Sequence, residues 1–245
     1  QPLLQQTPAH GISLYVSIPF CPTRCSYCSF VSHSIEQAQK LIPGYLEKLC
    51  VELEIWGQLV REQGLLVDTV YFGGGTPTAL TAAQLGQVLE AVQKNFDLSH
   101  LREYCVEAGR PDTITMEKLE TLKRFGVDRI SVNPQTMQDS VLETIGRKHT
   151  TAQTVEAFHM ARKAGFENIN MDLIAGLPGD TPDGFHDTLN QILALNPDSI
   201  TVHALTLKRA ANLFSEGERQ VHNPVEQMVQ ESMRRLPEHG YAPYY

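Results

Sequence analysis

Three cysteines stand close together near the start of the chain, at Cys21, Cys25 and Cys28. The sequence holds five cysteines, too few for a disulfide framework, and closely spaced thiols of this kind indicate metal or redox chemistry. Three thiolates on one short loop suit an iron–sulfur cluster, because soft sulfur ligands bind iron well. A cluster held by three cysteines keeps an open coordination position on one iron. The alternative is a structural zinc site with His33 as the fourth ligand.

A glycine run and an acidic residue follow at two later points. Gly73, Gly74 and Gly75 precede Thr76, and three glycines let a backbone approach a ligand more closely than side-chained residues allow. A tight turn is the alternative interpretation of that run. Glu107 ends a predicted strand, where its carboxylate can accept hydrogen bonds from ribose hydroxyl groups, as the acidic residue of dinucleotide folds does. Its alternative is a solvent-facing strand end.

Strand-like and helix-like segments alternate around these residues. The predicted strands are residues 12–20, 67–72, 104–108, 127–132, 169–175 and 199–205. The predicted helices lie around residues 46–60 and at 81–92, 115–125, 140–145, 151–164, 181–193 and 225–239. Thr81 with Gln84 three residues on indicates a capping box. Glycines that match left-handed helix ends stand at Gly64, Gly126, Gly165 and Gly240.

This alternation predicts six strand-then-helix units. It implies a parallel sheet with right-handed crossovers, and either a doubly wound open sheet or a barrel-like sheet satisfies it. The motifs favour the second fold, an α/β partial (β/α)6 TIM-like barrel, formed as one domain over residues 1–245. In both folds the chemistry lies at the C-terminal ends of the strands, which is where the cysteines, the glycine run and Glu107 fall.

The cysteine segment reads Cys21-Pro-Thr-Arg-Cys25-Ser-Tyr-Cys28, with Tyr27 directly before the last cysteine. This spacing after a first strand resembles the signature of the radical S-adenosylmethionine (SAM) superfamily. The resemblance implies a six-unit partial barrel whose [4Fe-4S] cluster is held by Cys21, Cys25 and Cys28. It also implies that the open iron binds the amino and carboxylate groups of SAM.

Further segments resemble the oxygen-independent coproporphyrinogen III oxidase family, also called coproporphyrinogen dehydrogenases. They are Tyr15-Val-Ser-Ile-Pro-Phe-Cys21, Tyr71-Phe-Gly-Gly-Gly-Thr-Pro-Thr78, Glu107-Ala-Gly-Arg-Pro111, Asn133-Pro-Gln135, Arg147 and Asp172-Leu-Ile-Ala-Gly-Leu-Pro178. This resemblance implies that Tyr15, Gly74 and Glu107 contact the cluster-bound SAM. It also matches positions around a second SAM, namely Tyr27, Gly75, Thr76, Gln135, Arg147, Asp172 and Thr206. Among these residues, Tyr15, Gln135 and Arg147 are assigned catalytic roles.

Three positions depart from the family's usual pattern. Ser17 stands where many relatives carry His, and Asn133 where Gly is common. Ser29-Phe30 follows Cys28 where some relatives have a fourth cysteine. Because these departures concern the second SAM and the strict oxidase identity, we expect one SAM and leave the second open.

The function that the resemblance implies is the oxidative decarboxylation of coproporphyrinogen III to protoporphyrinogen IX in heme biosynthesis. An oxidoreductase of this kind takes a tetrapyrrole substrate and an electron from reduced flavodoxin or a ferredoxin-type donor. Two alternatives stay open. One is a heme-binding chaperone of the same family, and the other is a different radical SAM reaction on a tetrapyrrole.

Composition limits the remaining partners. The 28 acidic residues outnumber the 20 basic ones, and the net charge of −8 argues against nucleic acid. No apolar stretch approaches the roughly 18–20 residues of a membrane span, and the start shows no signal-peptide pattern. We therefore expect a cytoplasmic protein. A monomer is expected as well, although nothing in the composition sets the oligomeric state. The chain begins and ends within what reads as continuing sequence, so we expect the radical SAM catalytic core of a longer protein, whose further C-terminal region covers the substrate.

Several other residues carry weaker signals. His203 either points into the barrel or is a satisfied core histidine. Lys208 and Arg209 follow the last predicted strand and either meet substrate carboxylates or stay solvated. Cys50 and Cys105 are expected to be small buried hydrophobic residues.

Overall fold

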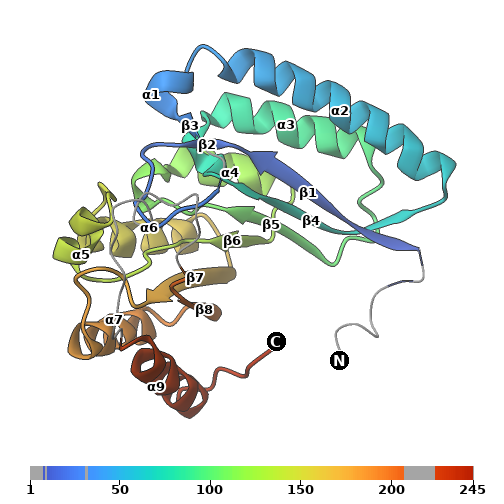
Figure 1. Cartoon of the computed structure of the whole chain (residues 1–245). Coiled ribbons are helices and arrows are strands. Elements are labelled where there is room, and N and C mark those ends of the chain that lie inside the picture. Colours follow the sequence, from blue (N-terminus) through green and yellow to red (C-terminus); the bar gives the residue numbers. More distant parts are fainter. Residues whose placement is uncertain (1–7, 9, 31–32, 207–223, 245) are drawn as a thin grey trace.

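The computed structural model describes residues 8, 10–30, 33–206 and 224–244, and strands and helices alternate along them (Figure 1). The strands are β1 (Gly11–Ile18), β2 (Phe20–Cys21), β3 (His33–Ser34), β4 (Leu66–Gly74), β5 (Glu103–Glu107), β6 (Arg129–Ser131), β7 (Asn168–Ala175) and β8 (Ser199–Ala204). The α-helices are α1 (Ile35–Ala38), α2 (Ile42–Glu62), α3 (Ala82–Asn95), α4 (Met116–Arg124), α5 (Asp139–Thr144), α6 (Thr151–Lys163), α7 (Pro182–Leu195) and α9 (Val225–Glu238). Short 3₁₀ helices at Pro77–Ala79 and Pro111–Thr113 follow β4 and β5.

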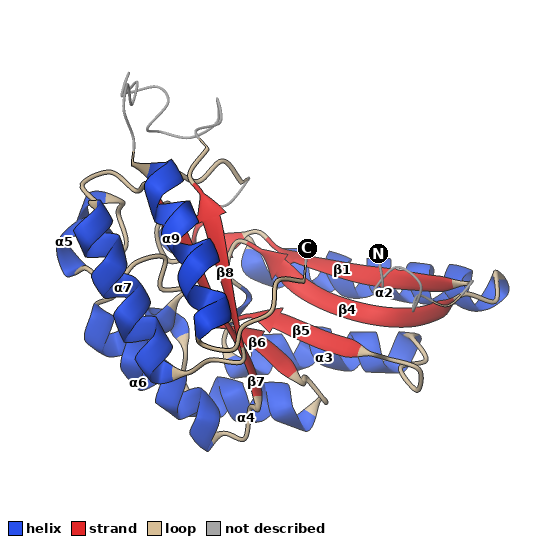
Figure 2. Cartoon of the chain, turned by 90° about the horizontal axis from the view of Figure 1, so that it is seen from below, coloured by secondary structure: helices blue, strands red, loops and turns tan. Residues whose placement is uncertain are grey.

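Six parallel strands form one sheet in the order β1-β4-β5-β6-β7-β8, and β2 pairs with β3 separately. The spatial order follows the chain order without reversal. A doubly wound sheet reverses its strand order at a switch point, so the observed order excludes that fold and confirms the predicted partial barrel. Figure 2 shows the sheet curving between its edge strands β1 and β8, with helices along its outer side.

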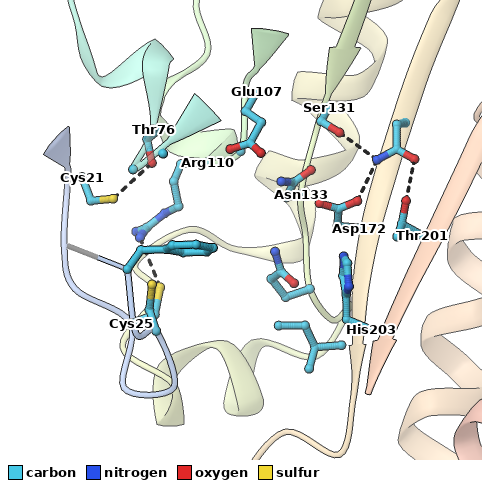
Figure 3. A pocket seen from close by; sticks show the side chains of 18 of the residues that line it. Cys21, Cys25, Thr76, Glu107, Arg110, Ser131, Asn133, Asp172, Thr201 and His203 are labelled. Carbon is cyan, nitrogen blue, oxygen red and sulfur yellow. Dashed lines mark hydrogen bonds between the residues drawn. The ribbon is translucent and has the colours of Figure 1, made fainter. Parts of the chain in front are cut away.

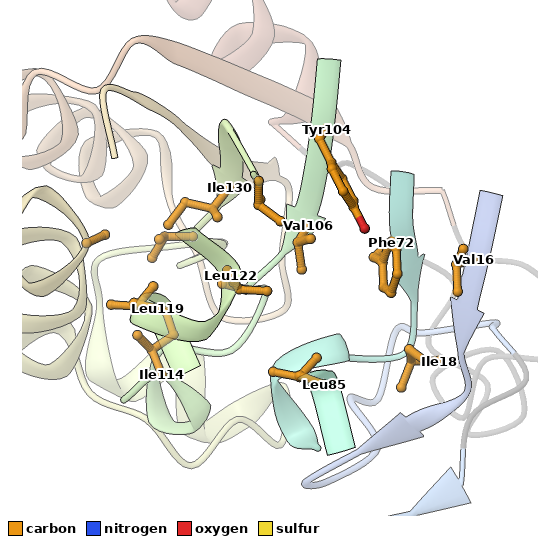
Figure 4. Close-up of a cluster of buried hydrophobic side chains, with 14 of the residues drawn as sticks. Val16, Ile18, Phe72, Leu85, Tyr104, Val106, Ile114, Leu119, Leu122 and Ile130 are labelled. Carbon is orange, nitrogen blue, oxygen red and sulfur yellow. The ribbon is translucent and has the colours of Figure 1, made fainter. Parts of the chain in front are cut away.

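The main hydrophobic core lies between the outer face of the sheet and the helices (Figure 4). Phe72 of β4 and Val106 of β5 share it with Leu85 of α3 and Leu119 of α4, and all four side chains are fully buried. Burying a side chain of this size contributes about 1.5–3 kcal/mol. The layer between sheet and helices therefore supplies most of the apolar burial that holds the sheet in place.

The inner face of the sheet is largely polar. Successive side chains of a strand point to opposite faces, so the neighbours of the buried outer residues line the inside. The residues of the six-stranded sheet that line the inner cavity are Tyr71, Gly74, Glu103, Cys105, Glu107, Arg129, Ser131, Asn170, Asp172, Ile174, Thr201 and His203. Closed TIM barrels instead fill this space with branched aliphatic side chains. The inside of this sheet thus offers room and hydrogen-bonding groups to a polar ligand.

Local signals in the sequence set most element ends. The backbone N–H of Gln84 donates to Thr81 Oγ1 at 3.2 Å and the N–H of Thr81 donates to Gln84 Oε1 at 3.0 Å, which confirms the predicted capping box. The four glycines expected at helix ends have the positive φ angles of left-handed caps, at Gly64, Gly126, Gly165 and Gly240.

The first predicted strand, residues 12–20, is broken at Pro19. Proline has no N–H to donate to a sheet, and the chain leaves β1 there. Phe20 and Cys21 then pair with His33 and Ser34, so the chain just before the cysteine loop lies beside the chain that follows it. Within the described ranges, none of the helices combines the length and the hydropathy needed to cross a membrane.

Candidate functional site

A cavity of about 610 Å³ occupies the inner face of the sheet and reaches its C-terminal edge (Figure 3). Its volume lies in the range typical of small-molecule sites. Eleven of the thirteen residues predicted to hold the cluster or SAM line it: Cys21, Cys25, Tyr27, Cys28, Gly74, Gly75, Thr76, Glu107, Gln135, Arg147 and Asp172. Residues that are far apart in the sequence therefore meet in one place.

The cysteine loop (residues 21–28) is anchored against the end of α5. The Ser26 backbone N–H donates to the Ile145 carbonyl at 3.1 Å, and the Thr23 hydroxyl donates to the Gly146 carbonyl at 2.9 Å. Within the loop, the N–H of Cys28 donates to the carbonyl of Cys25 at 3.1 Å. The loop thus has a defined conformation set by protein contacts.

The three loop thiols are free. Cys25 is buried, Cys21 and Cys28 are half-buried, and burial raises the pKa of the Cys28 thiol. Among the described residues, no three His, Cys, Asp or Glu side chains converge on a single ion position, and His33 is exposed. The exposure of His33, the fourth ligand of the zinc alternative, gives that alternative no support. Free sulfur donors at the mouth of a polar cavity suit the separate irons of a cluster.

The glycine run connects the cysteine loop to the sheet. The N–H of Gly75 donates to the Ile18 carbonyl, and the N–H of Thr76 donates to the Phe20 carbonyl, both at 2.8 Å. A Cβ atom on Gly75 would lie 2.7 Å from the Phe20 carbonyl oxygen, and Gly74 has a φ of 102°. Thr76 also donates a hydrogen bond to Cys21 Sγ at 3.5 Å. The run is therefore more than a turn, because its backbone positions the first cysteine.

Glu107 faces two groups that control its charge. The Tyr71 hydroxyl donates a hydrogen bond to Glu107 Oε1, and Asp172 lies near enough to act on it electrostatically. Burial raises the pKa of Glu107 to about 7, an effect that the Tyr71 hydrogen bond reduces and the Asp172 charge increases. The Asp172 carboxylate accepts from Asn170 Nδ2 at 2.7 Å. Glu107 thus changes charge near neutral pH.

Two buried oxygen atoms in the cavity, Asn133 Oδ1 and Gln135 Oε1, have no hydrogen-bond partner among the residues that the structure describes. Gln135 adopts the left-handed backbone conformation, with φ of 70°, which is unusual for a residue other than glycine. Its N–H donates to the Asp172 carbonyl and its carbonyl accepts from the Ile174 N–H, both at 3.0 Å. An unpaired buried acceptor is costly, so these atoms suit a ligand that brings hydrogen-bond donors.

Arg147 is buried behind the cysteine loop. Its guanidinium donates to the carbonyls of Asn133 and Gly109, and to the Tyr27 hydroxyl at 3.3 Å. Burial raises the pKa of Tyr27, so that side chain stays a neutral phenol. The arrangement clamps three loops together, which favours a positioning role for Arg147 over direct contact with a reacting atom.

Two predicted residues lie outside the lining of the cavity. Tyr15 is 59% exposed and stacks on Tyr71, with ring centroids 5.9 Å apart, and Tyr71 in turn donates a hydrogen bond to Glu107. Thr206 is exposed just after β8. His203 lines the cavity as an exposed side chain, which contradicts the core-histidine alternative. Lys208 and Arg209 lie outside the described residues.

Sequence reasoning missed two parts of the site. The first is Arg110, whose guanidinium lies against Cys25 (Figure 3). The second is a network on Asn170, which donates to Ser131 Oγ at 2.7 Å and accepts from Ser199 at 2.9 Å and Thr201 at 3.0 Å. For the Asn170 network the available signal was its polar residue types at alternate strand positions, since alternation places them all on the inner face.

Comparisons with known proteins connect this geometry to a family. The model of the radical SAM superfamily matches residues 15–192. The chain is 43% identical, over 96% of its length and 48% of the relative, to the oxygen-independent coproporphyrinogen-III oxidase-like protein HemZ of Bacillus subtilis. It is 34% identical, over 95% of its length and 62% of the relative, to the heme chaperone HemW of the same organism.

A solved structure agrees with these matches. The coproporphyrinogen III oxidase HemN of Escherichia coli, described as a radical SAM enzyme, aligns with a TM-score of 0.84 and 28% identity. That alignment covers 98% of this chain and 56% of the other. The chain spans about half the length of the curated relatives it matches.

Proposed function

Because this chain belongs to the radical SAM superfamily, in its coproporphyrinogen III oxidase-like branch, we propose that it catalyses the oxygen-independent oxidative decarboxylation of coproporphyrinogen III to protoporphyrinogen IX. Members of the superfamily use a [4Fe-4S] cluster and SAM. The observation that supports the proposal most is the meeting of three free thiols, Glu107 and the unpaired oxygens of Asn133 and Gln135 in one polar cavity.

Cys21, Cys25 and Cys28 are the proposed ligands of the cluster. Their loop is already held by α5 and by the glycine run, so cluster binding requires little rearrangement of the chain. When bound, the cluster would supply one electron for the reductive cleavage of SAM, which would start the radical chemistry on a substrate propionate, and loss of carbon dioxide and of one electron to an external electron acceptor would leave the vinyl group. We propose that a reduced flavodoxin or ferredoxin-type protein supplies that electron.

Glu107 is the proposed ribose ligand of SAM. Tyr71 occupies one carboxylate oxygen as a donor, which leaves the other oxygen to accept bonds from hydroxyl groups. Gly74 lies at the same end of the cavity, next to β1. Tyr15, which lies outside the cavity, supports this site through its stacking on Tyr71.

A second set of residues surrounds the deeper part of the cavity. Gln135 and Asp172 bring acceptor oxygens there, and Arg147 holds the loop that carries Gln135 through its hydrogen bond to the Asn133 carbonyl. With Tyr27, Gly75 and Thr76, these residues are the proposed surroundings of a second SAM or of the substrate edge that reacts. Thr206, exposed after β8, belongs to this set only through the family resemblance.

Heme delivery is the competing function, because the chain is also 34% identical to a heme chaperone. The experiment therefore has to distinguish the two functions. The test uses the complete natural protein that contains this chain, reconstituted anaerobically with iron and sulfide, reduced, and incubated with SAM and coproporphyrinogen III. We expect vinyl product and carbon dioxide together with 5′-deoxyadenosine, and none from a Cys28→Ala variant. Tight heme binding without any vinyl product would overturn the oxidase proposal and favour the chaperone.

A further inference from the structure

Arg110 is a buried cation that contacts the cysteine loop. Its side chain is 3% exposed, and its Nη1 lies 3.7 Å from Cys25 Sγ. The same guanidinium reaches Thr23 twice, with Nη1 at 3.4 Å from the carbonyl and Nη2 at 3.1 Å from Oγ1. Three contacts from one rigid fork fix the first half of the loop relative to the sheet.

The backbone that carries Arg110 is held as firmly as its side chain. The Arg110 carbonyl accepts from the Thr113 N–H at 2.9 Å and from the Thr113 hydroxyl at 2.7 Å. Lys118 of α4 in turn donates to the Thr113 carbonyl at 2.8 Å. Arg110 also lies only three residues after Glu107, so one short loop supplies both the proposed SAM ligand and the contact to the cysteines.

Positive charges outnumber negative ones in the buried surroundings of Cys25. Arg110 and Arg147 are both buried on this side of the loop, and Asp112 accepts from Arg110 Nε at 3.3 Å. His149 lies 4.0 Å from Asp112, and burial, with the two arginines, lowers its pKa to about 4, so it is neutral at physiological pH. Two cations and one carboxylate therefore leave net positive charge behind the Cys25 sulfur.

Positive charge next to a ligand sulfur favours the reduced form of an iron–sulfur cluster. Reduction adds an electron to a group already made anionic by its thiolates, and hydrogen bonds to the sulfurs and local charge set the potential. Burial strengthens this interaction because little water is present to screen it.

We propose that Arg110 is a positioning residue that holds the cysteine loop in place and raises the reduction potential of the cluster through Cys25. This inference rests on the proposed cluster ligands and is independent of the proposed substrate. It assigns to Arg110 no contact with SAM or with the reacting atoms.

The test measures the reduction potential of the reconstituted protein by a redox titration followed by electron paramagnetic resonance. Arg110→Gln is expected to lower the equilibrium constant for reduction at least tenfold, which is 59 mV for one electron. Asp112→Asn removes the offsetting carboxylate and is expected to shift the potential in the opposite direction. Arg110→Lys keeps a cation without the fork and should fall between wild type and Arg110→Gln. Arg124→Gln, the same change at an exposed arginine of α4, serves as the matched control.

The possible outcomes distinguish an error in the cysteine ligand set from an error in the role of Arg110. Failure of the wild-type protein to bind iron through its three loop cysteines would show that the ligand set is wrong. Full iron content in Arg110→Gln with a potential equal to that of Arg124→Gln would overturn the inference. If Arg110→Gln cannot retain iron, the Asp112→Asn potential decides, and an unshifted value overturns the electrostatic role. Faster amide exchange of residues 23–28 in metal-free Arg110→Gln, but not in the control, is expected from the positioning role.

Discussion

The hydroxyl group of Tyr71 donates a hydrogen bond to Oε1 of Glu107, across the boundary between the paired strands β4 and β5. Burial makes ionisation of Glu107 costly, and this hydrogen bond recovers part of that cost. Glu107 therefore has a pKa of about 7 and changes charge within the physiological pH range. Because it is the proposed ribose ligand, its protonation state should control SAM binding.

The first prediction is that SAM affinity rises with pH between about 6 and 8. The ionised carboxylate accepts hydroxyl hydrogen bonds and is populated above a pKa of about 7. Tyr71→Phe removes a bond that lowers this pKa, so the midpoint of the affinity curve should move to higher pH. Isothermal titration of SAM into reconstituted protein across this range checks both effects, and an affinity that does not change with pH would contradict them.

A second prediction concerns Glu107→Gln. This variant should keep its iron yet bind SAM more weakly by about 1–3 kcal/mol, the cost of losing hydrogen bonds to a charged group. Its affinity should also lose the pH dependence of the wild-type protein. Equal SAM affinity in variant and wild type would leave Glu107 as an ordinary residue of the cavity wall.

The raised pKa of Glu107 also predicts that the folding stability changes with pH. Its pKa in the folded protein is above the ordinary value of 4.5, so the stability present at low pH is lost as pH rises through about 7. Glu107→Gln cannot ionise and should gain free energy of unfolding relative to wild type at pH 8 but not at pH 4. Urea unfolding of the metal-free proteins at both values measures the difference. A relative stability that is the same at pH 4 and pH 8 would refute the assigned shift.

A fourth prediction tests which cysteines hold the cluster. Cys21→Ala, Cys25→Ala and Cys28→Ala should each abolish the brown colour and the roughly four irons per chain expected of a [4Fe-4S] protein. Cys50→Ala and Cys105→Ala are matched controls that should retain both. Cys105 lines the same cavity, so loss of iron in its variant would show that a fourth thiol takes part.

Gly75→Ala tests the connection between the glycine run and the cysteine loop. The new Cβ would lie 2.7 Å from the Phe20 carbonyl oxygen and 2.9 Å from that of Ile18, so the backbone must move. We expect lower iron incorporation and a loss of stability of about 1–3 kcal/mol, as for other overpacked positions. Gly44→Ala is the control, because its Cβ meets no atom within 4 Å. Equal iron content in both variants would refute the role of the run in placing Cys21.

The fold could be predicted because its signals are local. Apolar spacing, the Thr81 cap and glycines at helix ends act within a few residues of one another, and six strands each followed by a helix leave few topologies. The break at Pro19 was missed because the alternating pattern continues through it, and only the pairing of Phe20 with His33 reveals a separate strand.

The sequence predicted which residues form the site better than it predicted which of them contact each other. Motif spacing identified the cysteines, the glycine run and Glu107, which do meet in one cavity. The approach of Arg110 to Cys25 joins residues 85 positions apart, and no local pattern encodes a distance of that kind. For the same reason the sequence could not show that Tyr15 stacks on Tyr71 outside the cavity.

The two faces of the sheet also bear on how this protein can change over evolutionary time. Apolar residues that hold the fold together alternate along each strand with polar residues that line the cavity. Replacing an inner residue removes little buried hydrocarbon, so a lineage can try new ligands with a small loss of folding stability. Outer residues have no such freedom, because a shortened side chain there leaves a void. Sequence divergence among proteins of this architecture should therefore concentrate at those inner strand positions that hold neither the cluster nor SAM, with substrate range changing faster than shape.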